Sequence, residues 1–257
     1  MANRHATCYN FPIMDEPTST QSVKQILTLP VAILVAGLVI GGAIIYTKGS
    51  PEVVADQPAT VGDTRNYGPQ NMKPVDESDH IIGNPNAAVK IVEYSDLECP
   101  YCKEFHPLLH KIIEDYGKQG DVAWIYRHFP LLSKHPKALA EAHASECAAE
   151  IGGDGAFWKY IDKVFEVSPT NNGLDLALLP KIAETLGLDV EAWTKCQDSN
   201  KFRPLIEAQL NDGIQSGITG TPTSFIISKS GKVYPLGGWI NYDALKQIIE
   251  LAIADKL

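Results

Sequence analysis

The chain has 257 residues, of which 44% are hydrophobic and 21% are charged, and its formal net charge is −9. This apolar content is typical of a globular protein and excludes wholesale disorder. No basic stripe accompanies the acidic balance, so the sequence does not support nucleic-acid binding. With only five cysteines, the fold must rest on a hydrophobic core and not on a dense set of disulfides.

The N-terminal region contains the uncharged run "LPVAILVAGLVIGGAIIY". About 17 to 25 apolar residues cross a bilayer as a helix, so the run predicts a transmembrane anchor over residues 26–47, preceded by a tail over residues 1–25. A cleaved signal peptide is the alternative. Against it, the tail carries Asp15 and Glu16, and the run exceeds the usual apolar region of roughly 7–15 residues. A lysine flanks each end, so the positive-inside rule does not set the orientation.

Residues 48–79 are rich in Pro, Asp and Gly and predict a flexible linker before a domain over residues 80–257. In that domain, "AVKIVEYSD" (88–96) is apolar and β-branched and predicts a buried strand. A helix is expected over residues 99–117 and a second strand over residues 121–131. A strand, a helix and a strand in this order form a βαβ unit, so the two strands should be parallel.

The next part of the chain predicts helices separated by Gly, Asn and Pro, over residues 136–151, 156–167, 176–186, 190–199 and 202–216. A hairpin follows at residues 223–238, with turn residues at Ser228–Gly231, and a final helix begins at Tyr242. The predicted fold class is α/β, with an all-helical insert at about residues 134–216 between the strand-forming segments.

The stretch "SDLECPYCKEF" places two cysteines, Cys99 and Cys102, at the predicted junction of a strand and a helix. Pro100 suits a first helical turn, where a missing N–H costs nothing. Unpaired N–H groups and the helix dipole stabilise a thiolate there and lower the pKa of Cys99. Cys102 lies three residues further on and can resolve a mixed disulfide. A C-x-x-C in this setting is typical of a redox-active dithiol.

Two further features accompany the dithiol. Glu93 lies in the strand before it; an inward-facing carboxyl there would be desolvated, have a raised pKa and exchange a proton with Cys102. The alternative is a side chain that points to solvent at the strand edge. The segment "GITGTPTSF" contains the Thr221–Pro222 bond, a candidate cis proline, with an ordinary trans turn as the alternative.

Four motifs together carry a resemblance: "VEYSDLECPYC", "YRHFPL" with "HPKALAEAHASECA", "GLDVEAWTKC" and "GITGTPTSFII". Residues 80–257 resemble the DsbA-like branch of the thioredoxin superfamily, in which a helical domain interrupts a thioredoxin fold. The resemblance implies that Cys99 is the nucleophile, Cys102 the resolving cysteine and Glu93 the buried acid. It also implies a cis Pro222 packed against the dithiol, and pairing of the Thr221 backbone with the substrate strand. No cofactor is expected.

Similar bacterial proteins often carry a cysteine pair in the helical insert, so the resemblance implies a structural disulfide between Cys147 and Cys196. On the loop-entropy account this disulfide would contribute about 4 kcal/mol to stability. Two buried free thiols are the alternative. Cys8, in the tail before the predicted anchor, is expected to be reduced and cytoplasmic.

Two departures from the family pattern leave the direction of electron flow open. The typical oxidase dipeptide is Pro-His, whereas this chain has Pro100 and Tyr101, so Cys99 should be less acidic and the disulfide less oxidising. Threonine before the cis proline resembles disulfide isomerases and reductases as much as oxidases.

These inferences predict a monomeric, membrane-anchored thiol–disulfide oxidoreductase that is single-pass, with its catalytic domain on the extracytoplasmic side, because a dithiol oxidase fits an oxidising compartment. Its expected partners are unfolded or extended cysteine-containing proteins and a membrane or thiol partner that recycles the dithiol. A disulfide isomerase or reductase is the first alternative. A non-catalytic binding module is a distant one, because the C-x-x-C is intact.

The sequence also offers one set of possible zinc ligands with the spacing C-x2-C-x3-H-x3-H: Cys99, Cys102, His106 and His110. Four ligands spread along about three turns of one straight helix cannot converge on one ion. We therefore expect no metal there. Three other histidines are interpreted as loop and surface residues: His128, His135 and His143.

Overall fold

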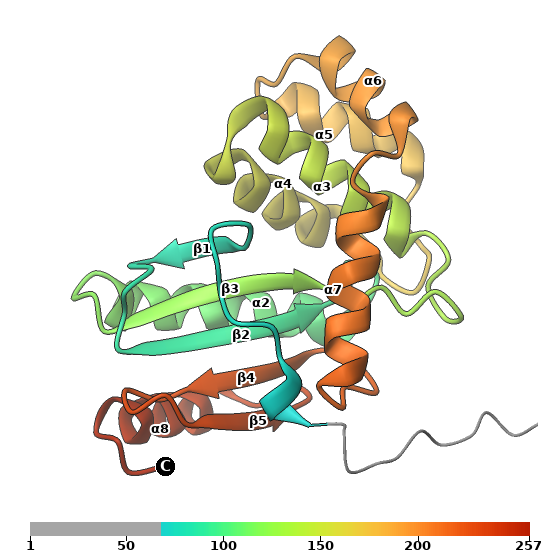
Figure 1. Ribbon diagram of the computed structural model, residues 1–257. Coiled ribbons are helices and arrows are strands. Elements are labelled where there is room, and N and C mark those ends of the chain that lie inside the picture. Colours follow the sequence, from blue (N-terminus) through green and yellow to red (C-terminus); the bar gives the residue numbers. More distant parts are fainter. Residues whose placement is uncertain (1–67) are drawn as a thin grey trace, which may run out of the picture. The chain divides into compact units, whose positions relative to one another are not determined.

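The computed structural model describes residues 68–257 (Figure 1). The expected tail, the expected anchor over residues 26–47 and most of the expected linker lie outside the described residues. Among the helices of residues 68–257, none is long and apolar enough to cross a membrane.

The centre of the fold is a five-stranded sheet with the order β1-β3-β2-β4-β5. The strands are β1 (His80–Gly83), β2 (Val89–Ser95), β3 (Val122–His128), β4 (Thr223–Ile227) and β5 (Val233–Gly237). As the βαβ pattern predicts, β2 and β3 are parallel; the other neighbouring pairs are antiparallel. The predicted hairpin joins β4 to β5, and the Gly231 N–H donates to the Ser228 carbonyl in its turn at 2.8 Å. Strand β1 has only four residues, too few for an alternating sequence pattern to predict it.

Helices cover the sheet and fill the insert. They are η3 (Pro69–Asn71), α2 (Pro100–Ile112), the π-helical turn η4 (Ile113–Gly117), α3 (Ala138–Gly152), α4 (Asp154–Val167), η5 (Leu176–Leu178), α5 (Leu179–Thr185), α6 (Val190–Ser199), α7 (Arg203–Gln215) and α8 (Tyr242–Ile253). Between β3 and β4 the chain forms only helices, which confirms the predicted helical insert. Figure 1 shows α3 to α6 gathered beside the sheet and α7 returning to it, where α7 packs against β3.

Each face of the sheet carries its own core, because successive side chains of a strand point to opposite faces. The first core, which includes residues of α2 and α8, contains Ile91, Leu109, Trp124, Tyr126 and Ile249. The second core, which α7 and the segment before β1 cover, contains Val92, Tyr94, Ile125 and Phe225. In β2, Glu93 has the same parity as Ile91, so it faces the core that includes α2.

The segment before β1 is packed against the domain, so the linker that was predicted to extend to residue 79 ends earlier. Arg127 of β3 is 1% exposed, and its guanidinium lies 2.8 Å from Asp79 and 2.9 Å from Asp212 of α7. It also donates to the carbonyl of Lys73 at 2.9 Å. A buried guanidinium needs such partners, because an unpaired buried charge is very costly. The composition of the segment resembles a linker because only a few of its residues, such as Met72, Val75 and Asp79, make these contacts.

Three histidines contradict the sequence interpretation, because the structure buries all of them: His128, His135 and His143 are 1%, 6% and 2% exposed. Each has a polar partner within the protein. His128 Nε2 lies 3.0 Å from Glu146, His135 Nδ1 lies 2.9 Å from Asp96, and His143 Nδ1 lies 2.9 Å from Gln197. A paired imidazole can be buried without a large penalty, which is why residue type alone gave the wrong placement.

Candidate active site

The two cysteines lie at the junction between β2 and α2. Cys99 is the N-cap of α2, with extended backbone angles of φ −79° and ψ 123°, and Pro100 occupies the first helical turn. The Cys99 N–H donates to the Asp96 carbonyl at 3.0 Å, and this bond fixes the entry to the helix. Both thiols are free and buried, with Cys99 4% and Cys102 0% exposed. The predicted strand–dithiol–helix arrangement is therefore present.

The surroundings of the two sulfurs push their pKa values in opposite directions. The pKa of Cys99 is lowered to about 6, first by the hydrogen bond from the Cys102 side chain and also by the backbone N–H groups of Tyr101 and Cys102. Burial raises the pKa of Cys102 well above its usual value, and the hydrogen bond with Cys99 and the charge there raise it further. One thiol is thus prepared to be an anion near neutral pH, while its neighbour keeps its proton.

The segment before β4 brings a second element to Cys99. The Thr221–Pro222 peptide bond is cis. The Cys99 thiol donates to the Thr221 carbonyl oxygen across an Sγ–O distance of 3.4 Å. Residues separated by more than a hundred positions in the sequence therefore meet at the nucleophilic sulfur.

Glu93 lies inside the domain and not at a solvent-facing edge of β2. Its side chain is completely buried, and Oε2 accepts a hydrogen bond from Trp124 Nε1 at 3.0 Å. Burial raises the pKa of Glu93 to about 7, and negative charge on Cys99 raises it too. Glu93 in turn contributes to the raised pKa of Cys102. A carboxyl with these properties can gain or lose a proton at neutral pH close to the dithiol.

Comparison with known proteins agrees with this geometry. Residues 75–250 match the family model described as thioredoxin. The chain belongs to this family. Among solved structures, alpha-DsbA1 from Wolbachia pipientis is 27% identical with a TM-score of 0.63 over 74% of this chain and 97% of that one. DsbA2 from Pseudomonas aeruginosa is 31% identical with a TM-score of 0.53 over 72% of this chain and 100% of that one. The chain is thus DsbA-like within the thioredoxin superfamily.

One curated relative is named as an ion antiporter and not as a thiol–disulfide protein. The Na+/H+ antiporter NhaA 3 of Salinispora tropica is 35% identical over 156 residues, which are 60% of this chain and 22% of the antiporter. The chain spans only about a fifth of that relative, so the antiporter's name says nothing about this chain's own activity.

Two hydroxyl groups near the dithiol of this DsbA-like protein were missed by the sequence reasoning. Ser95 lies two residues after Glu93 on the same face of β2, and Tyr126 of β3 lies opposite Glu93 in the parallel register. Both hydroxyls and Glu93 Oε1 are buried without a hydrogen-bond partner in the described part of the chain. The nearby Ser95 hydroxyl also acts to lower the pKa of Cys102, against the larger effect of burial. The two-residue period of a strand is the signal that could have identified Ser95.

A pair of buried carboxyl groups supports the loop that leads to Cys99. Glu98 and Glu141 are both 0% exposed and interact with each other. Burial raises the pKa of Glu141 to about 10, and the Glu98 carboxyl raises it further, so Glu141 stays protonated at neutral pH. Glu98 also accepts a hydrogen bond from the Asn172 backbone N–H, which ties this loop to the insert. No sequence pattern links these distant residues.

The two cysteines of the insert are joined to each other. Cys147 of α3 and Cys196 of α6 form a disulfide with a Cα–Cα distance of 5.8 Å, the pairing that the resemblance implies. Trp193 Nε1 of α6 donates to the Ala144 carbonyl of α3 at 3.1 Å, so the same two helices are also joined by a hydrogen bond. The disulfide holds the insert together, separately from the dithiol.

The possible zinc set suggested by the sequence does not form. Cys99 contacts Thr221, whereas His106 and His110 both lie within hydrogen-bond distance of Asp162 in α4. The tyrosine of the C-x-x-C, Tyr101, is 60% exposed.

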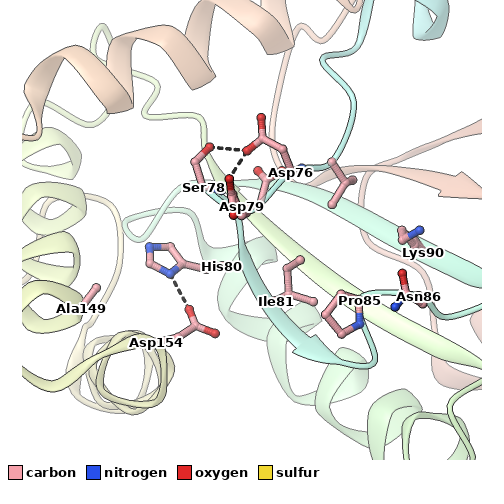
Figure 2. Close-up of a pocket in the computed structure, with 12 residues that line it drawn as sticks. Asp76, Ser78, Asp79, His80, Ile81, Pro85, Asn86, Lys90, Ala149 and Asp154 are labelled. Atoms are coloured by element: carbon pink, nitrogen blue, oxygen red, sulfur yellow. Dashed lines mark hydrogen bonds and ion pairs between the residues drawn. The ribbon is translucent and has the colours of Figure 1, made fainter.

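A cavity of about 730 Å³ beside β1 is separate from the dithiol, because none of the active-site residues lines it (Figure 2). Figure 2 shows His80 directed at Asp154, with Nδ1 2.6 Å from the carboxylate. Burial disfavours the charged imidazole, but hydrogen bonds to Asp154 and Glu146 outweigh it and raise the pKa of His80 to about 9. His80 is therefore a half-buried cation that joins β1 to Glu146 and Asp154 of the insert.

Proposed function

We propose that this protein is a membrane-anchored oxidoreductase that introduces disulfides into extracytoplasmic proteins through Cys99 and Cys102. The observation that carries the proposal is the position of Cys99 as the N-cap of α2, 3.4 Å from the carbonyl oxygen of the cis Thr221–Pro222 segment. This setting lowers the pKa of Cys99 to about 6, whereas the pKa of the buried Cys102 is raised. A low pKa makes Cys99 a good leaving group and stabilises the reduced dithiol, which is the property of an oxidant. The apolar run within residues 26–47 supplies the proposed anchor.

In the proposed reaction, a substrate thiolate attacks Cys99 Sγ of the Cys99–Cys102 disulfide. The S–S bond breaks, a mixed disulfide forms with Cys99, and Cys102 leaves as a thiolate. Because the pKa of Cys102 is raised, it takes a proton, and Glu93, with a pKa of about 7, is the nearby acid that can supply it.

In the second step, another substrate thiolate attacks the substrate sulfur of the mixed disulfide. The substrate disulfide forms and Cys99 leaves as a thiolate, which its surroundings stabilise. Two electrons have then moved from two substrate thiols to the dithiol. A membrane or thiol partner must accept these electrons to restore the Cys99–Cys102 disulfide. No cofactor takes part in these steps.

Substrates should bind as extended chains beside the cis Thr221–Pro222 bond. The Thr221 carbonyl lies 3.4 Å from Cys99 Sγ, so a chain that pairs with the Thr221 backbone would bring its own sulfur to the nucleophile. Unfolded or partly folded cysteine-containing proteins provide such chains. A monomer is sufficient for this reaction, since one chain supplies both thiols, Glu93 and the Thr221–Pro222 segment.

Disulfide isomerisation or reduction is the second candidate function. It is favoured by Tyr101, which is 60% exposed and supplies no cationic group to Cys99. Without such a cation the dithiol should be a weaker oxidant than one with histidine at this position.

The deciding experiment equilibrates the full-length protein with glutathione and measures the reduction potential of Cys99–Cys102. We expect a value less negative than about −200 mV and stoichiometric formation of a disulfide in a reduced, unfolded substrate. A potential near about −270 mV, the value for thioredoxin, would assign the protein to the reductases.

The location can be tested with a membrane-impermeant thiol reagent in intact cells. We expect labelling of reduced Cys99 before lysis and of Cys8, on the other side of the proposed anchor, only after lysis. Cys99→Ser serves as the control that identifies the labelled site. Labelling of Cys99 only after lysis would reverse the proposed orientation.

A further inference from the structure

A group of metal-binding side chains lies on α2 beyond Cys102, on the same face of the helix as that cysteine. His106 and His110 are one helical turn apart on α2, and Asp162 comes from α4 in the insert. His106 Nε2 lies 2.6 Å from Asp162 Oδ1, and His110 Nε2 lies 2.8 Å from the same oxygen. The two Nε2 atoms are 3.2 Å apart. Three possible ligand atoms therefore converge on one point from two helices.

We propose that His106, His110 and Asp162 form a binding site for a zinc ion. In a tetrahedral zinc site with bonds of about 2.0–2.2 Å, neighbouring ligand atoms are roughly 3.3–3.5 Å apart. The Nε2–Nε2 distance of 3.2 Å already approaches this spacing. To reach this spacing, only the Asp162 carboxylate must move away from the two Nε2 atoms. Its side chain is 43% exposed, so it has room to move.

The surroundings provide what an incomplete ligand set needs. A cavity of about 390 Å³ opens beside the three residues, and its lining also includes Pro107, Lys111 and Glu114. It leaves a fourth position for water or for Glu114, which lies four residues beyond His110 in the π-helical turn η4. Two imidazoles and one carboxylate are a donor set that suits zinc.

The histidines are held in place before any ion arrives. The His106 side chain is 6% exposed, and the rings of both histidines lie 5.1 Å from that of Trp124. His106 Nδ1 is buried and has no hydrogen-bond partner in the described part of the chain, so its Nε2 is the atom that faces the carboxylate.

An ion at this point would join α2 of the thioredoxin fold to α4 of the insert. This site differs from the zinc set rejected above, because neither cysteine contributes to it and Asp162 is 52 positions from His110. It does not depend on the proposed direction of disulfide exchange.

The test is zinc binding by the full-length chain in detergent, without a histidine tag. The dithiol is kept oxidised and Cys8 is alkylated, so no thiol can bind the ion. Isothermal titration with Zn²⁺ should show one site per chain. Asp162→Asn and His110→Ala should each weaken binding by more than about tenfold. Glu166→Gln, which removes the same charge from an exposed position on the same helix, should leave binding unchanged.

The proposal would be overturned if the oxidised wild-type chain bound no zinc, or if Asp162→Asn bound zinc as tightly as wild type. Should a variant fail to fold, the wild type still decides the question. Nitrogen-15 NMR of histidine-labelled protein should then show Zn²⁺-dependent shifts at Nε2 of His106 and His110. Shifts confined to other histidines would contradict the proposal.

Discussion

The two cysteine pairs of the described domain are buried to a similar degree but have different electrostatic surroundings. Cys99 is 4% exposed and Cys196 is 7% exposed, so access to solvent does not distinguish them. Cys99 is the N-cap of α2, where the Cys102 side chain and backbone N–H groups lower the pKa of its thiol. Cys147 lies inside α3 and is joined to Cys196. The comparison predicts that reactivity follows what stabilises a thiolate more closely than it follows exposure.

The largest expected effect is the loss of disulfide exchange when the reactive pair is mutated. Cys99→Ser should abolish disulfide exchange, because no other described thiol has a lowered pKa. The double variant Cys147→Ser/Cys196→Ser should keep most of the activity as long as it is folded. The measurement is the rate of disulfide formation in a reduced peptide with two cysteines. Full activity in Cys99→Ser would refute the assignment of the nucleophile.

The next largest effect is a loss of stability when the structural disulfide is removed. Cys147 and Cys196 are separated by 49 positions, so their disulfide restricts a long loop of the unfolded chain. Replacing both with serine should lower the free energy of unfolding by about 4 kcal/mol. Urea unfolding with the dithiol kept oxidised measures this loss. A loss smaller than about 1 kcal/mol would show that other contacts, such as the Trp193–Ala144 hydrogen bond, hold the insert.

A third change separates proton transfer from nucleophilicity. Glu93→Gln should slow the step that returns a proton to Cys102 by about 100-fold at neutral pH, as measured by stopped-flow fluorescence of the nearby Trp124. Glu104→Gln, at an exposed position on α2, is the matched control and should have no effect. Equal rates in the two variants would remove Glu93 from the mechanism.

Glu93→Gln should also change how the free energy of unfolding depends on pH. The pKa of Glu93 is raised from 4.5 to about 7, so the folded protein binds its proton more tightly than the unfolded chain does. The stability of the wild type should therefore fall, relative to Glu93→Gln, as the pH rises from about 4.5 to about 7. Unfolding curves of the two proteins across this range measure the difference. A constant difference would contradict the raised pKa.

The smallest expected effect is a shift in the pKa of Cys99 and in the reduction potential when Tyr101 is replaced. Tyr101→His would place a cation beside Cys99, so the pKa of Cys99 should fall by about one unit. The reduction potential should become less negative by about 30 mV, because the reduced dithiol is stabilised. Tyr101→Phe should leave both values unchanged. An equal shift in the two variants would show that ring packing, and not charge, sets the potential.

Local sequence patterns were enough to predict most of the elements and the position of the dithiol. The start of α2 follows from Cys99 and Pro100, and the parallel pairing of β2 and β3 follows from the helix between them. Glu93 could be predicted because a charged residue stands out in a buried strand.

What the sequence did not predict depends on partners far apart in the chain. Arg127 binds Asp79 across 48 positions and thereby ends the linker early. His128 is buried because Glu146 reaches it from α3. Asp162 meets His106 across 56 positions. Such pairs leave no periodic pattern, so the structure was needed to identify them.

The ionisation of Cys99 tests the central claim most directly. In the reduced full-length protein, the rate of Cys99 alkylation should rise with a midpoint at a pH of about 6, while Cys102 stays unreactive until far higher pH. Peptide mass mapping separates the two cysteines from Cys8. A midpoint near about 8.5, the value of an ordinary thiol, would contradict the account, because Cys99 would then have no stabilised thiolate.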